Sequence, residues 1–168
     1  GFAPAGETPR SLRIGGAGRL ELAGEVVLDG GGDIVLAVAD LELGGQPVVT
    51  RMGDIALTLP DKTDLKGLVR SGGGNISITG MGDLGVLGVI EAADGDLELI
   101  VERALTTAAD TRLRAPNGRL SLTLWDDRHE MPTRALRTEV AALDIHARSL
   151  SLAIENTAPV LTLGNVWV

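Results

Sequence analysis

Four segments of this chain begin with the same pattern at the same interval. Each starts with a glycine and a polar residue, and alternating apolar positions follow; the polar residues are Asp33, Asp54, Asn75 and Asp96. They are 21 positions apart three times in succession, without an insertion. A fixed period of this length is the signature of a solenoid, in which each repeat is one coil that buries its apolar face only against its neighbours. The period therefore constrains the architecture more than any other feature of the sequence.

Within each repeat the apolar residues alternate with polar ones over short runs, which indicates β-strands. A helix is disfavoured because glycine recurs every few residues and costs about 1 kcal/mol at each helix-interior position. We therefore predict an all-β fold, a parallel β-helix (β-solenoid) with coils of 21 residues. A β-sandwich also fits short strands separated by turns, but it gives no reason for three equal intervals.

Stacked coils bring equivalent residues of successive repeats directly over one another, about 4.8 Å apart. The first and third positions after each polar residue then form two interior columns. The first column contains Ile34, Ile55, Ile76 and Leu97, and the second contains Leu36, Leu57, Ile78 and Leu99. Burying one such side chain contributes roughly 1.5–3 kcal/mol. The columns therefore supply a core although aromatic residues make up only 2% of the chain.

We expect one domain. Residues 1–11 contain two prolines and two glycines and are predicted to be an irregular lead-in, and residues 12–168 are predicted to form a single β-solenoid domain. The period weakens in the last third, where residues 125–134 carry charges of both signs and a proline and are predicted to form a loop excursion. The alternation over residues 140–145 fits a strand or a short helix, and we favour the strand. The first residue and the apolar end indicate a mature form or a segment of a longer protein.

Composition excludes several classes of function. The formal net charge is −8, so phosphate backbones and anionic membrane surfaces are repelled and we expect no nucleic-acid partner. The chain has no cysteine, which excludes disulfides and thiolate metal sites. No stretch approaches the ~20 apolar residues of a membrane helix, so we expect no membrane insertion. The 23 glycines fall at regular boundaries, and we expect them to serve turns that require positive φ.

The pattern GDIxLxx, followed by a second strand such as LELGG and then a third, resembles the haemagglutinin-type repeats of filamentous haemagglutinin-like adhesins and of giant bacterial surface proteins. The resemblance covers roughly residues 19–119. It implies a right-handed parallel β-helix, an extracellular or cell-surface location, and a structural role in an adhesin or an extracellular fibre. A host or surface receptor is the external partner that it implies.

The repeated polar position has two interpretations. Hard cations take oxygen ligands, so Asp33, Asp54 and Asp96, with Asn75 between them, are candidates for binding Ca²⁺. The alternative is that aspartate and asparagine after glycine serve a hydrated corner. We favour the corner, because the nonapeptide Ca²⁺ repeat has a different spacing, and we expect no metal and no cofactor.

The densest polar cluster is the predicted loop. Loops on a rigid scaffold carry contacts with partners, so we predict a partner-contact site at Trp125, Asp126, Asp127, Arg128 and His129. A catalytic or metal site around His129 would need a second group held beside it, and the only other histidine is His146. Trp125 and Trp167 are too few to argue for a carbohydrate groove.

Three functions follow from these observations. The first is a structural β-solenoid segment of a secreted or cell-surface adhesin or an extracellular fibre. The second is a self-assembling protomer that forms filaments through its coil ends, with adjoining coils of other copies as partners. The third is a carbohydrate-active β-helix enzyme. We favour the first and expect no enzymatic activity, because no catalytic constellation is recognisable.

Overall fold

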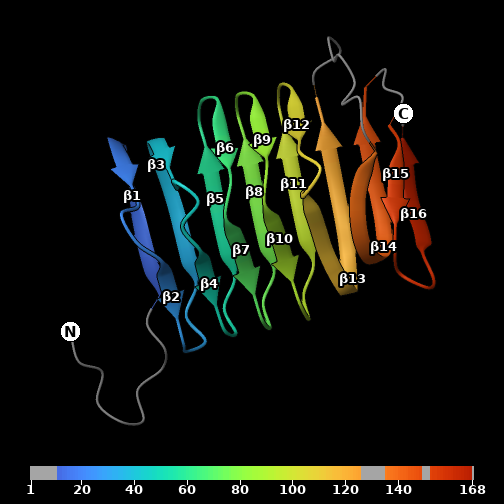
Figure 1. Ribbon diagram of the computed structural model, residues 1–168, viewed down its shortest axis with the longest axis horizontal. Coiled ribbons are helices and arrows are strands. Elements are labelled where there is room, and N and C mark those ends of the chain that lie inside the picture. Colours follow the sequence, from blue (N-terminus) through green and yellow to red (C-terminus); the bar gives the residue numbers. More distant parts are fainter. Residues whose placement is uncertain (1–10, 126–134, 149–151, 168) are drawn as a thin grey trace.

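The computed structural model describes residues 11–125, 135–148 and 152–167. This part of the chain contains sixteen strands and no helix, arranged as stacked coils (Figure 1). The strands are β1 (Leu12–Glu21), β2 (Val26–Leu28), β3 (Ile34–Glu42), β4 (Val48–Thr50), β5 (Ile55–Leu59), β6 (Thr63–Leu65), β7 (Leu68–Ser71), β8 (Ile76–Gly80), β9 (Leu84–Val86), β10 (Val89–Ala92), β11 (Leu97–Val101), β12 (Leu105–Thr107), β13 (Arg112–Leu124), β14 (Leu136–Ala147), β15 (Ile154–Asn156) and β16 (Thr162–Trp167).

The strands form three walls. The first wall is β1, β3, β5, β8 and β11, followed by the second halves of β13 and β14 and then by β16. The second wall is β2, β4, β7 and β10, followed by the first halves of β13 and β14 and then by β15. The third wall is β6, β9 and β12. Since β13 and β14 turn a corner without a break, they belong to two walls, and the first and second walls form one continuous sheet.

Each ladder is parallel, and the coils number about seven. The register follows the period of the sequence, so that Ile34 pairs with Ile55 and Ile55 pairs with Ile76. The β-solenoid predicted from the repeat is therefore confirmed. The region for which we favoured a strand is also confirmed, because residues 140–145 lie within β14.

The two predicted interior columns are present and continue beyond the repeats. Ile34, Ile55, Ile76 and Leu97 are at most 1% exposed, and Leu120 and Leu143 extend their column into β13 and β14. The buried hydrophobic residues of the described part are all leucine, isoleucine, valine or alanine. Such small aliphatic side chains interdigitate across the narrow space between walls without the large volume of an aromatic ring.

The repeat glycines have a different role from the one we expected. Among the described glycines, only Gly16, Gly44 and Gly45 have positive φ. The glycine that opens each repeat is required by close approach instead. A Cβ on Gly53 would lie 2.0 Å from the carbonyl oxygen of Gly32, and a Cβ on Gly74 would lie 2.2 Å from that of Gly53. Our prediction that positive φ explains the repeat glycines was therefore wrong, because these corners stack too tightly for any side chain.

Candidate functional site

The acidic column, which we define as Asp33, Asp54, Asn75 and Asp96, is a hydrogen-bond ladder along one corner. The Oδ1 atom of each member accepts a hydrogen bond from the backbone N–H of the equivalent residue one coil later. The four bonds run from Asp54 to Asp33 (2.8 Å), Asn75 to Asp54 (2.7 Å), Asp96 to Asn75 (2.8 Å) and Arg119 to Asp96 (2.8 Å). Each side chain thus serves a corner N–H that the strand ladders leave without a partner.

The hydrogen bond that Oδ1 accepts from the next coil explains why a carboxylate or an amide recurs at this position. Both groups offer an oxygen acceptor of the same reach, so Asn75 replaces aspartate without breaking the ladder. In the described part of the chain, no group of three or more His, Cys, Asp or Glu side chains converges in a way that could hold a metal ion. In each of the calcium candidates Asp33, Asp54 and Asp96, the Oδ1 atom already accepts a hydrogen bond from a backbone N–H.

Two buried hydroxyls support the same corner from inside. Thr50 donates from Oγ1 to the Gly32 carbonyl (2.8 Å) and accepts from the Gly53 N–H (3.3 Å). Ser71 repeats this arrangement one coil later, donating to Gly53 (2.7 Å) and accepting from Gly74 (2.9 Å). Both side chains are fully buried. Each hydroxyl therefore links two successive coils and satisfies backbone groups that the close glycine contact draws away from water.

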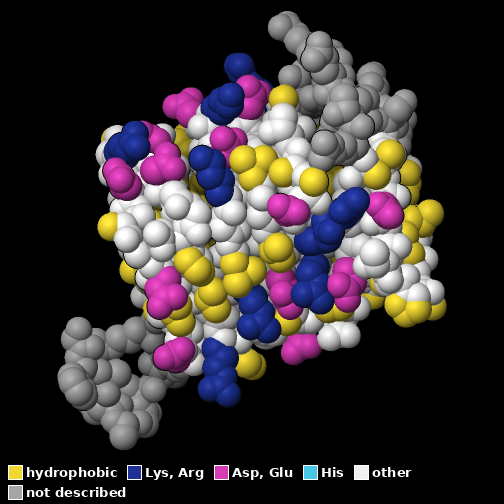
Figure 2. All heavy atoms as spheres, in the orientation of Figure 1, with side chains coloured by type: hydrophobic (Ala, Val, Ile, Leu, Met, Phe, Trp, Pro, Cys, Tyr) yellow, Lys and Arg dark blue, Asp and Glu magenta, His cyan; other side chains and the backbone are white. Residues whose placement is uncertain are grey.

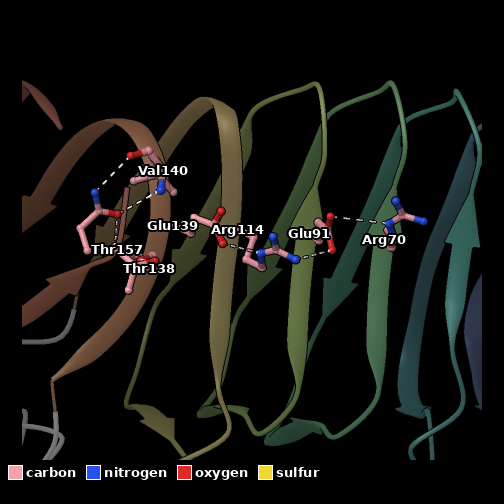
Figure 3. Close-up of polar contacts among 8 residues, drawn as sticks. Arg70, Glu91, Arg114, Thr138, Glu139, Val140 and Thr157 are labelled. Atoms are coloured by element: carbon pink, nitrogen blue, oxygen red, sulfur yellow. Dashed lines mark hydrogen bonds and ion pairs between the residues drawn. The ribbon is translucent and has the colours of Figure 1, made fainter. Parts of the chain in front are cut away.

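A charge row, which we define as Arg70, Glu91, Arg114 and Glu139, crosses the outer side of the second wall (Figure 3). The Arg70 Nε lies 3.7 Å from a Glu91 carboxylate oxygen, and Arg114 bridges Glu91 (3.2 Å) and Glu139 (2.8 Å). The Glu139 bond, with the nearby charges of both glutamates, raises the pKa of Arg114 against the opposing effect of burial. Side chains of alternating charge on four neighbouring strands thus join each coil to the next along the stack.

This row was not predicted from the sequence. Its signal was an alternation of charge sign at intervals close to the coil period, on positions that face outward. On the face in Figure 2, Lys and Arg side chains are interspersed with Asp and Glu side chains rather than gathered by sign. The charges on that face are therefore mixed, which does not favour a strongly charged ligand.

A second ion pair joins β13 and β14 on the first wall. The Arg119 guanidinium forms a hydrogen bond with Asp144, whose other oxygen accepts the Asn165 N–H at 2.7 Å. Both bonds lower the pKa of the Asp144 carboxyl, with the Arg119 bond contributing most. The spacing from Asp144 to Asn165 is again 21 residues, but Asp144 pairs with Ser121 inside β14, so this bond lies at the register shift between β14 and β16 rather than at the corner.

Asn156 fastens β15 to β14 through Thr138 and Val140, the two residues that flank Glu139 of the charge row (Figure 3). Its Oδ1 accepts bonds from the Thr138 hydroxyl (2.9 Å) and the Val140 N–H (3.0 Å), and its Nδ2 donates to the Val140 carbonyl (3.3 Å). The Thr157 N–H adds a bond to the Thr138 carbonyl (2.9 Å). These contacts give the last coil a polar anchor where its apolar contacts are fewer.

An aromatic row, which we define as Trp125, His146 and Trp167, lies on the outer side of the first wall. The Trp125 and His146 ring centroids are 5.7 Å apart, those of His146 and Trp167 are 5.5 Å apart, and each pair is tilted by 36°. The Arg148 guanidinium carbon lies 5.4 Å from the Trp125 ring centroid. The sequence did not indicate that these three ring residues lie together, although they too are 21 positions apart.

Of the five residues predicted as a partner-contact site, the structure describes only Trp125. It follows β13, and its N–H donates to the Val101 carbonyl (3.0 Å), while its side chain is 43% exposed. Asp126, Asp127, Arg128 and His129 lie outside the described residues, as does most of the predicted loop excursion. The partner-contact site stays a prediction.

Shallow hollows on the described surface include the following two. One, of 320 Å³, is lined by Ala108, Ala109, Ala135, Arg137 and Glu155. The other, of 300 Å³, lies over β8, β11 and β13, where the Ser77 hydroxyl donates to Glu98 (3.1 Å). Neither lining combines a hydroxyl, a histidine and a carboxylate in the arrangement of a nucleophile activated by a base.

The fold defines the described chain as a parallel β-solenoid with an aliphatic interior and no helix. Comparisons with protein-family models, with curated proteins and with solved structures found no match. Within the described residues there is no helix of the length and apolarity that crossing a membrane demands.

Proposed function

We propose that this chain is a rigid structural segment, a β-solenoid spacer in a secreted or cell-surface adhesin or an extracellular fibre. The observation that supports it is the continuity of the first wall, in which parallel pairing runs from β1 to β16 without a break. A stack held by backbone ladders, interior columns and side-chain bridges resists bending along its whole length. Such a stack separates whatever lies at its two ends by a fixed distance.

The polar contacts favour the same role. The acidic column, the buried hydroxyls and the charge row each join one coil to the next rather than converging on a central point. A binding or catalytic centre gathers polar groups from several elements around one cavity. Here the polar groups are spread along the stack, which is the distribution that a spacer needs.

The spacer hypothesis predicts that whole coils can be removed. Deleting residues 54–74 removes β5, β6 and β7 and joins Gly53 to Asn75, so that Ile34 meets Ile76 in the same column. We expect this variant to fold and its longest dimension, measured by small-angle X-ray scattering, to shorten by about 4.8 Å. The control deletes residues 54–63, which breaks the register and places polar side chains in the core. We expect the control variant to be unfolded by circular dichroism.

Two results would contradict the proposal. If the 21-residue deletion unfolds the chain as the control does, the coils are not interchangeable spacer units. The surface location has its own test, in which intact cells of the producing organism are treated with a non-permeant protease. Removal of the protein supports exposure at the surface, and full protection refutes it.

Head-to-tail assembly is a second candidate, favoured by the apolar last coil. Leu163 and Val166 pair with the buried Leu143 and Ile145, yet they are 61% and 45% exposed. In the described chain β16 pairs with β14 alone, and β1 pairs with β3 alone. A second copy that sets its β1 on β16 would continue both interior columns. However, both outer strands contain a register shift, a feature that discourages edge pairing, so the spacer is placed first.

Sedimentation velocity over a range of concentrations, with electron microscopy, tests assembly. Filaments or concentration-dependent growth that Leu163→Lys abolishes would support it, provided that Met81→Lys, at a 47% exposed site on an interior coil, leaves growth unchanged. A single species of monomer mass at every concentration would refute it.

A further inference from the structure

The chain places both of its tryptophans on the outside. Trp125 is 43% exposed and Trp167 is 71% exposed, while the buried core of the described part contains no aromatic residue. An indole has the largest apolar area of any side chain, so exposing two of them forgoes part of the free energy that their burial would supply. Exposed aromatic side chains that gather on one surface mark a contact with something outside the chain.

The solenoid determines the spacing of these rings. Trp125, His146 and Trp167 come from successive coils, and the strand register pairs His146 directly with Trp167. Their centroids are 5.7 Å and then 5.5 Å apart from one coil to the next. This separation is close to the length that one hexopyranose residue adds to an extended β-linked glycan. The spacing therefore matches one ring to each sugar residue.

Charged and polar groups lie beside the row. The Arg148 guanidinium lies over Trp125 on one side. Asp144, which forms an ion pair with Arg119, is two residues before His146 in β14, and Asn165 is exposed two residues before Trp167. Hydroxyl groups can donate to the carboxylate and accept from the guanidinium, while the apolar face of the sugar ring covers an indole.

We propose that this aromatic row, with Arg148 and Asp144 beside it, is a binding site for a neutral β-linked glycan. The site deepens the adhesin function proposed above and rests on it. A nucleic acid is disfavoured because the chain has a net charge of −8 and would repel the phosphate backbone. An extended glycan repeats at a fixed length and so matches a row with one ring per coil, whereas a protein surface has no such repeat.

The test titrates the full chain with cellohexaose and with chitohexaose by isothermal calorimetry and tryptophan fluorescence. Because Trp125 and Trp167 are the only tryptophans, a change in emission reports on the proposed site directly. We expect at least one saccharide to bind, and Trp167→Ala and Trp125→Ala each to weaken binding about tenfold or more. Trp167→Phe should retain most of the affinity because it keeps a ring. Val27→Ala, at a 44% exposed site on β2, is the control that should bind as the parent does.

Several results would overturn the proposal. They are no heat and no emission change with either saccharide, or binding that survives both tryptophan-to-alanine changes. If instead the parent chain self-associates and Trp167→Ala abolishes that association without any saccharide binding, the row is a contact between copies. Thermal melting by circular dichroism shows whether each variant is folded. Removing residues 54–74 tests the spacer without touching the row, so the two proposals can fail separately.

Discussion

The glycine that opens a repeat gives the sharpest test of the coil geometry. In Gly74→Ala, the new Cβ would lie 2.2 Å from the Gly53 carbonyl oxygen, 2.4 Å from the Gly53 carbonyl carbon and 2.6 Å from Asp54 Oδ1. The first two atoms belong to the backbone, so no side-chain rotation can remove the overlap. The two coils must separate at this corner by roughly 1 Å before the contact becomes tolerable.

That separation acts on a known set of hydrogen bonds. The Ser71 hydroxyl bonds to Gly53 at 2.7 Å and to the Gly74 N–H at 2.9 Å, and the Asn75 N–H bonds to Asp54 at 2.7 Å. The Ser71–Gly74 bond lies within one turn, so the separation lengthens only the Ser71–Gly53 and Asn75–Asp54 bonds, and roughly 1 Å takes both beyond the range of a hydrogen bond. At a net 0.5–1.5 kcal/mol for each bond, the loss is about 1–3 kcal/mol. For a chain of this size it corresponds to a fall in Tm of roughly 2–12 °C.

The assay is thermal and urea unfolding followed by circular dichroism, with Gly18→Ala as the matched control. A Cβ on Gly18 has no atom within 4 Å, and Gly18 does not have positive φ. Reduced freedom of the unfolded chain makes this control neutral or more stable by up to about 1 kcal/mol. If Gly74→Ala and Gly18→Ala unfold at the same temperature, close backbone approach is not the reason for the repeat glycine.

Four further outcomes follow. Leu57→Asp places a charge in a 1% exposed column position and should cost about 4 kcal/mol or more, read as loss of the folded circular dichroism signal. Asp54→Ala should lower the free energy of unfolding by about 1 kcal/mol, whereas Asp54→Asn should be near neutral because an amide already makes the same bond one coil later. Glu91→Gln should destabilise, and the difference from the parent chain should shrink in high salt, as measured by urea unfolding. Arg119 lowers the pKa of Asp144 below its ordinary 3.8, so this pair stabilises the fold at neutral pH and loses that effect progressively as pH falls from about 3.8 through the lowered pKa; the Tm difference between the parent chain and Asp144→Asn should shrink over that range and vanish below it.

The sequence was sufficient to predict the architecture because packing acts on every coil in the same way. Ile34, Ile55 and Ile76 occupy one environment repeated along the stack, so the same residue type satisfies each position. The period and the inward column follow from that repetition. The role of the repeat glycine could not be read from the sequence, because close approach and positive φ both select glycine.

The later coils were harder to place. Leu97 pairs with Leu120, a step of 23 residues, because the turn before β13 contains two extra residues. Thr111 accommodates them by accepting the Ala108 N–H (2.8 Å) and donating to the Val86 carbonyl, which closes the turn against the coil beneath. The longer turn increases the number of residues between equivalent positions but leaves those positions in the same columns. The period is therefore lost in the sequence although the coils continue to stack.

The aromatic row was missed for a different reason. Packing in the core does not restrict the residue type at outward positions. A regular spacing at such positions is therefore recognised only when three residues from successive coils are compared. Trp125, His146 and Trp167 differ in type, and only their common spacing of 21 residues links them. The charge row escaped notice in the same way, since its members alternate in sign.

The direction of the ladders determines how this molecule would yield under load. Its inter-strand hydrogen bonds point along the stack, and β1 and β16 lie at opposite ends of it (Figure 1). Tension between those ends would therefore pull on one coil boundary at a time, in series, and the chain would peel open in steps of about one turn. A force-extension trace should show a train of small, evenly spaced drops in place of one large rupture.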